Sequence, residues 1–103
     1  MWAQLITMRL KPGKDQDLPK VYKQLEATEQ PGSGLVRSIA MRDQNDPSRV
    51  YSLVIFESQA KAREREQDER RQAGLQAVRE TMAEVFDGPP EFVDLLVIND
   101  YAS

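Results

Sequence analysis

Arg37 is the side chain best placed to bind an anion from within an apolar segment. It interrupts an apolar run and shares its parity with Leu35, Ile39 and Met41. If this face of the segment lines a pocket, the guanidinium can pair with a substrate carboxylate or phenolate. The alternatives are an ion pair with Asp94 or an exposed position near the end of a strand.

Tyr51 offers a second polar group, a phenol that can hydrogen-bond to a bound anion, although an amphipathic tyrosine is also common in a core or an interface. Other side chains are suited to binding a small apolar molecule: Trp2, Tyr22, Met41, Arg65, Met82 and Phe86. The aromatic and methionine side chains serve equally well as core filling. Arg65 belongs to a run of mixed charges that is typical of a solvated face or of a pocket mouth for anions.

The sequence contains neither histidine nor cysteine. The commonest general base, the commonest metal ligand and the thiolate nucleophile are therefore missing. The serines have no histidine to activate them, and no carboxylates are paired in an apolar setting. We expect neither a metal nor another cofactor.

Composition narrows the choice of partners. The 103 residues carry a net charge of −3, and the isoelectric point is near 5.0. These values disfavour nucleic acid, which requires a concentrated basic surface. No apolar stretch approaches the length of a membrane span and no leader pattern is visible, so we expect a cytoplasmic protein. The length predicts one domain over residues 1–103.

The candidate residues must be positioned by four strands and two helical regions. Strands are predicted over residues 2–10, 35–42, 50–56 and 92–98, from β-branched and aromatic runs bounded by turn residues. Apolar residues at helical spacing predict a helix that begins near Asp15 or Asp17, with Pro19 in its first turn. A second helical region is predicted over residues 59–86, capped by Ser58 and weakened by Gly74. The order β-α-β-β-α-β predicts an α+β ferredoxin-like fold with an antiparallel sheet.

The strands are apolar at both parities, which is unusual for an antiparallel sheet with one face in water. In the last strand, Phe92 and Leu96 lie on one side, and Val93 and Leu95 on the other. One face would pack on the helices, and the other would form an exposed apolar patch unless it is covered. We therefore expect a homodimer through the outer sheet face. The alternative is a monomer with generally apolar strands.

With this order in place, the chain resembles the antibiotic-biosynthesis-monooxygenase-like family, whose members are dimeric α+β barrels. The resemblance spans nearly the whole chain in element order and spacing. It is carried by Lys11-Pro12-Gly13 after the first strand, Pro31-Gly32 before the second, Phe56-Glu57-Ser58 at the end of the third, and Phe86-Asp87-Gly88-Pro89-Pro90 after the long helical region.

The resemblance implies a pocket between helices and sheet in each subunit. There, some members oxidise phenolic or anthrone-like polyketides with molecular oxygen and without metal or flavin, because the deprotonated substrate supplies the electrons. Arg65 stands at roughly the position where many relatives carry a histidine. Haem degradation, which ligates iron through histidine, is therefore not expected. Another group must deprotonate the substrate, or the substrate must already be acidic.

We therefore expect a protein that binds a small hydrophobic, aromatic molecule. The enzyme hypothesis is a cofactor-independent monooxygenase of phenolic or polyketide-like substrates, with Arg37 or Tyr51 stabilising an anion. The competing hypothesis is a non-catalytic ligand-binding or interaction domain on the same dimeric barrel.

Overall fold

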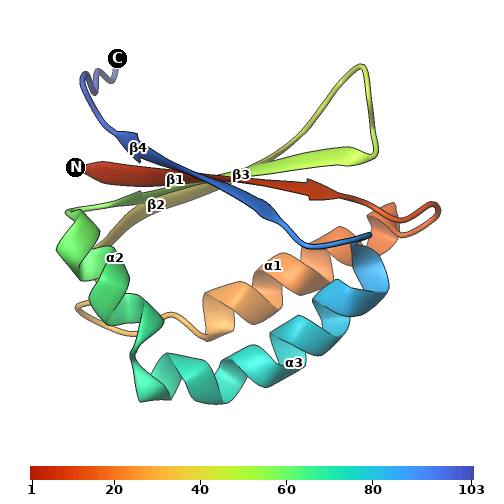
Figure 1. The fold of residues 1–103 in the computed structure, drawn as a ribbon, viewed down its shortest axis with the longest axis horizontal. Coiled ribbons are helices and arrows are strands. Elements are labelled where there is room, and N and C mark those ends of the chain that lie inside the picture. Colours follow the sequence, from red (N-terminus) through yellow and green to blue (C-terminus); the bar gives the residue numbers. More distant parts are fainter.

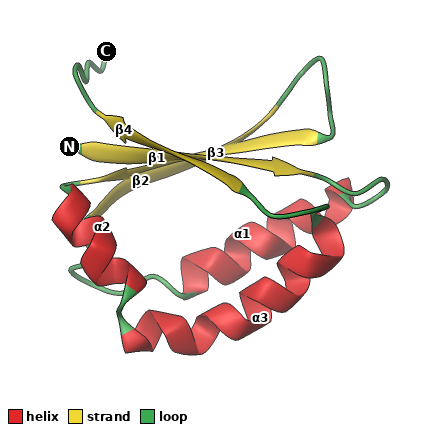
Figure 2. Ribbon diagram, viewed as in Figure 1, coloured by secondary structure: helices red, strands yellow, loops and turns green.

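A four-stranded antiparallel sheet carries all the helices on one of its faces (Figures 1 and 2). The computed structural model describes residues 1–103. Its elements are β1 (Trp2–Arg9), the 3-10 turn η1 (Asp15–Asp17), α1 (Leu18–Ala27), β2 (Leu35–Arg42), β3 (Arg49–Phe56), α2 (Gln59–Glu66), α3 (Glu69–Val85) and β4 (Glu91–Leu96). The strand order β2-β3-β1-β4 confirms the predicted ferredoxin-like α+β fold.

Strand pairing settles which residues share a face of the sheet. Residues directly opposite one another in neighbouring strands project to the same side. One row across the sheet joins Ile39, Leu53, Leu5 and Val93. Val50 and Phe56 of β3 pack against helix residues, so Leu53 and its row, at the opposite parity, lie on the outer face of the sheet. No helix covers this face (Figure 2). The adjacent rows face the helices.

The long helical region predicted over residues 59–86 is two helices rather than one. α2 ends at Glu66, and α3 begins at Glu69 with Asp68 as its N-cap, whose side chain accepts a hydrogen bond from the Arg70 backbone N–H. The predicted weak point, Gly74, lies inside a continuous α3. A Cβ at Gly74 would stand 2.9 Å from Cγ2 of Thr28, so the glycine allows α1 and α3 to approach closely.

The other predicted element ends need smaller corrections. β4 ends at Leu96, two residues earlier than predicted, and Ile98 is 96% exposed. Asp17 occupies the N-cap position of α1 without a capping hydrogen bond from its side chain, and Pro19 lies in the first turn as predicted. The predicted cap of α2 is confirmed, because the Ser58 hydroxyl accepts a hydrogen bond of 3.1 Å from the Lys61 backbone N–H.

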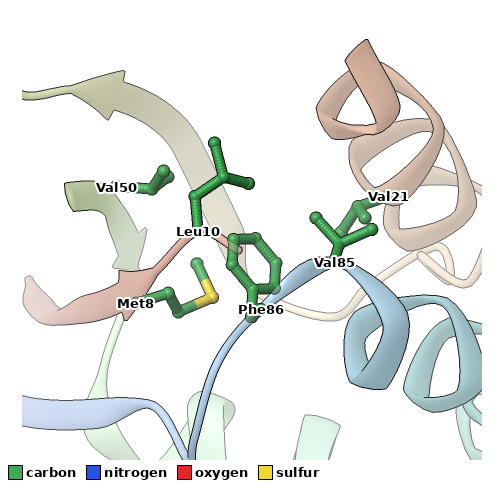
Figure 3. Close-up of a cluster of buried hydrophobic side chains, with 6 residues drawn as sticks. All are labelled: Met8, Leu10, Val21, Val50, Val85 and Phe86. Carbon is green, nitrogen blue, oxygen red and sulfur yellow. The ribbon is translucent and has the colours of Figure 1, made fainter. Parts of the chain in front are cut away.

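The hydrophobic core is divided into two clusters at opposite ends of the sheet. The larger is shown in Figure 3, where strand residues meet helix residues around one aromatic ring: Met8, Leu10, Val21, Val50, Val85 and Phe86. The smaller joins Trp2 and Phe56 to Ala62 of α2. Between the two clusters, the side chains of the helices and of the sheet leave a space unfilled.

Candidate functional site

A cavity of about 580 Å³ lies between the sheet and the helices. All four strands and all three α-helices contribute to its wall. Its lining is mostly apolar, with a few polar groups, and its volume falls in the range of small-molecule sites. The space is open to solvent at its rim, where Glu26, Glu66 and Phe92 are exposed, so a small molecule could enter it from outside.

The sheet floor explains why the space is unfilled. The rows that face the helices carry small side chains at their centre, namely Ser38, Ala40 and Ser52. α1 and α3 pack on one another, and Leu75 and Val78 of α3 are buried. The side chains on the sheet are small, and α1 and α3 pack partly on one another. The space between the two layers is therefore left open for a ligand.

A polar pair bridges the two layers inside this space. The hydroxyls of Tyr22 on α1 and Ser52 on β3 lie 3.2 Å apart and share a hydrogen bond. Burial raises the pKa of the Tyr22 phenol above its ordinary value, although the hydrogen bond to Ser52 opposes this. Tyr22 is therefore a neutral hydrogen-bond donor at physiological pH, able to turn from Ser52 to a ligand oxygen.

An ion pair forms part of the cavity wall at α2. Arg65 binds the Glu29 carboxylate through its Nε and Nη2 atoms, with a shortest distance of 2.7 Å, and its guanidinium lies 5.4 Å from the centre of the Phe56 ring. Burial alone would raise the pKa of the Glu29 carboxyl. Hydrogen bonds from Arg65 and Ser33 and the nearby positive charges outweigh it and hold that pKa below its ordinary value.

Two aromatic rings, from Trp2 and Phe56, form part of the cavity wall, and Arg63 of α2 packs against one of them. The Trp2 and Phe56 rings are 5.9 Å apart and tilted by 40°. The Arg63 guanidinium lies 5.6 Å from the centre of the Trp2 ring and reaches Asp94 of β4 at 3.6 Å. These contacts attach α2, which contains no large apolar residue, to the sheet.

Four of the predicted site residues meet in this cavity: Trp2, Tyr22, Arg65 and Met82 line its wall. Phe86 does not line it; it is buried in the larger core cluster beside Met8 and Leu10 (Figure 3). Arg65 is not a free cation at a pocket mouth, because Glu29 occupies it.

Arg37, Tyr51 and Met41 lie elsewhere, on the outer face of the sheet. A β-bulge between Leu35 and Arg37 places these two residues on opposite faces, although their sequence parity is the same. Leu35 lines the cavity, whereas Arg37 is exposed on the far side.

The exposed alternative for Arg37 therefore agrees with the structure, and the ion pair with Asp94 does not. β2 and β4 are the two opposite edges of the sheet, and Asp94 pairs with Arg63.

Sequence reasoning missed several residues that the structure brings to the cavity. Gln4 and Ser52 could have been identified, because each is a polar residue on the side of its strand that otherwise carries core residues such as Trp2 and Phe56. Glu29 carried none, because its partner Arg65 is 36 positions away.

Acidic side chains nowhere gather in a group that could hold a metal ion. None of the helices has both the length and the apolar character required to cross a bilayer.

The fold and its interlayer space define a ferredoxin-like α+β protein with a mainly apolar cavity between sheet and helices. The chain belongs to the antibiotic biosynthesis monooxygenase family, whose model matches residues 1–83. No curated protein matches the sequence.

Solved structures with the same fold include family proteins from two bacteria. The one from Nitrosomonas europaea is 16% identical, with a TM-score of 0.75, and the match covers 96% of this chain and 100% of that one. The one from Bordetella bronchiseptica is 19% identical, with a TM-score of 0.74 and coverage of 95% and 97%.

SnoaB from Streptomyces nogalater, a cofactor-independent oxygenase, is 12% identical, with a TM-score of 0.73 and coverage of 99% and 97%. At these identities the likeness establishes the fold, and function has to be argued from the site.

Proposed function

We propose that the interlayer cavity binds a small, mainly apolar aromatic molecule, and that the protein acts on it as a cofactor-independent monooxygenase of phenolic or polyketide-like substrates. The observation that carries the proposal is the cavity itself. Its wall combines the Trp2 and Phe56 rings with one central polar pair, which suits a flat ring bearing oxygen substituents.

The chemistry follows from what an oxygenase without a cofactor must do. The family resemblance implies that a substrate anion gives its electrons to molecular oxygen, so the protein has to bind the ring, stabilise the anion and exclude water. The Tyr22 hydroxyl is a donor available for the anion, in the role first predicted for Tyr51 and Arg37. It reaches the cavity from α1, and those two residues do not.

A second function, ligand binding without chemistry, is favoured by the titration behaviour of the same groups. The pKa of Glu29 is held low and that of Tyr22 is raised, so both are shifted away from neutrality. Neither group is suited to abstract a proton near pH 7. With neither of these two groups as the base, the substrates best suited to an oxygenase reaction here are those acidic enough to arrive as an anion.

Oxygen uptake separates the two functions. Anthrones and quinols of graded acidity are incubated with the protein under oxygen. We expect uptake with the acidic members, and kcat/KM lower by about tenfold or more in Tyr22→Phe, because one hydrogen bond to a charged group is lost. Tyr101→Phe is the matched control, since Tyr101 is 88% exposed in the C-terminal segment.

Uptake that is equal in wild type and Tyr22→Phe would contradict the role of Tyr22. No uptake across the panel, with ligands bound and returned unchanged, would establish the second function.

We also propose that the molecule is a homodimer joined through the outer sheet face. The row Ile39, Leu53, Leu5 and Val93 is continuous across all four strands, and Val93 is 49% exposed. A second copy of the same face would cover this row in a two-fold arrangement. Arg37, Tyr51 and Met41 would then be interface residues.

A further inference from the structure

Arg71 is the cation of the cavity that has no anion. It lies in the first turn of α3 and lines the cavity wall. Its Nε atom is buried and has no hydrogen-bond partner. Buried polar groups are paired in nearly all native structures, so a buried donor without a partner is unusual. Arg71 is half-buried, and an unpaired donor on a side chain that lines a ligand-sized space points to a ligand as its acceptor, which a rotation of this side chain would reach.

The neighbouring arginines show that Arg71 is the exception. Arg63, Arg65 and Arg70 each have a carboxylate within 4.0 Å, whereas no carboxylate lies within that distance of Arg71. Burial, together with the positive charge of Arg65, lowers the pKa of Arg71, although Glu29 and Glu66 oppose the shift. The guanidinium stays charged at neutral pH, and its charge is poorly compensated.

The surroundings of Arg71 select among anions. A guanidinium offers a planar pair of donors that matches a carboxylate. Glu29 contributes a negative charge to the same region of the cavity, and Glu66 and Glu26 add two more at its exposed rim. These charges repel a doubly charged phosphate more strongly than a singly charged carboxylate. The rest of the lining is mainly apolar and accepts an aromatic ring.

We propose that the cavity binds an aromatic monocarboxylate, with its carboxylate on the Arg71 guanidinium and its ring against the apolar lining. This inference rests on the proposed binding function and narrows the ligand class. It assigns Arg71 as a binding residue that selects acids over their neutral analogues.

Binding of 1-naphthoate and of its neutral analogue 1-naphthamide to the full chain tests the inference. Calorimetry measures the affinities, and the indole N–H resonance of Trp2, the only tryptophan, reports occupancy of the cavity. We expect wild type to bind the acid at least about tenfold more tightly than the amide, as one charge-assisted pair implies. Arg71→Gln should lose this preference and keep its affinity for the amide.

Arg79→Gln is the matched control, because Arg79 is exposed on the same helix and does not line the cavity. It should keep the preference for the acid. The Arg71 Nε–H resonance of wild type gives a reading that does not depend on any variant folding. It should shift with naphthoate and not with naphthamide.

Equal affinity for acid and amide in wild type would overturn the carboxylate assignment and leave the binding function standing. Unchanged acid preference in Arg71→Gln would also overturn it. Binding of neither probe would overturn the proposed binding function and this inference together.

Discussion

The Glu29–Arg65 pair shows how individual charges are held at the edge of the cavity. Its side chains are 25% and 16% exposed, so the pair is only partly screened by solvent. Removing one member of such a pair leaves the other charge without compensation, which costs more than the pair contributes. Glu29 follows the C-cap of α1 and Arg65 belongs to α2, so the pair also links the segment after α1 to α2.

Glu29→Gln should therefore destabilise the protein by about 1–3 kcal/mol at pH 7, because Arg65 loses its acceptor. The folded-state pKa of Glu29 lies below its ordinary value. Its contribution is thus fully present above the ordinary glutamate pKa of about 4.3 and is lost as pH falls through the lower folded value.

Urea unfolding at pH 7 and at pH 3 measures both effects. The difference in the free energy of unfolding between wild type and Glu29→Gln should be smaller at pH 3 than at pH 7. Glu26→Gln, one turn earlier on α1 and exposed, should show little change. If this difference in the free energy of unfolding were the same at both pH values, ionisation of Glu29 would not contribute to the pH dependence of stability.

The contact between α1 and α3 depends on a glycine that helix propensity alone would disfavour. Gly74 lies where Thr28 packs, and Thr28 is 4% exposed and fixed by a 2.7 Å hydrogen bond from its hydroxyl to the Leu25 carbonyl. Its methyl group cannot turn away without breaking that bond. The requirement for close packing outweighs the cost of glycine in a helix, roughly 0.5–1 kcal/mol.

Gly74→Ala should consequently destabilise the protein by about 1 kcal/mol, since a Cβ 2.9 Å from Thr28 Cγ2 overpacks the contact. In a Thr28→Ser background, which keeps the hydroxyl and removes the methyl, the same change should be stabilising by up to about 1 kcal/mol. A double-mutant cycle of thermal unfolding measures this reversal of sign. If Gly74→Ala stabilised the protein in both backgrounds, contact with the Thr28 methyl group would not be the reason for a glycine at position 74.

The whole molecule presents two unequal faces of one sheet. The helix-facing side encloses the cavity, and the outer side bears an apolar row with no cover (Figure 1). Full burial of one exposed apolar side chain is worth roughly 1.5–3 kcal/mol, and each residue of this row would gain part of that, because Ile39, Leu53 and Leu5 are half-buried and Val93 is 49% exposed. The cost of association is subtracted from this gain. A dimer would also stiffen the floor of the cavity, because each strand contributes to both faces.

Leu53→Lys should convert the proposed dimer into a folded monomer. Leu53 lies in the middle of the outer row, where a two-fold interface would bury the lysine twice. In a monomer its stem can follow the sheet and its ammonium can reach water. Light scattering after size exclusion should give about twice 11.8 kDa for wild type and 11.8 kDa for the variant.

Gln76→Lys, which adds the same charge on an exposed position of α3, is the control and should stay dimeric. A wild type that is monomeric at micromolar concentration would end the dimer proposal.

The sequence was sufficient for the order of elements, because turns and apolar runs are local signals. The strand and helix order, the Ser58 cap and Pro19 in the first turn of α1 could all be read in this way. The division of α2 from α3 was missed, because Asp68 lies in a run of charges that reads as one solvated helix.

The composition of the cavity could not be read from the sequence, because the strands are apolar at both parities and either face could have met the helices. The β-bulge after Leu35 places Arg37 on the opposite face of the sheet from Leu35. The alternation of residue types cannot reveal such an insertion when the strand is apolar at both parities. The charges around the cavity come together only through packing, since Glu29, Arg65 and Arg71 belong to three separate segments. Long-range packing, and not local preference, therefore decides which residues can touch a ligand.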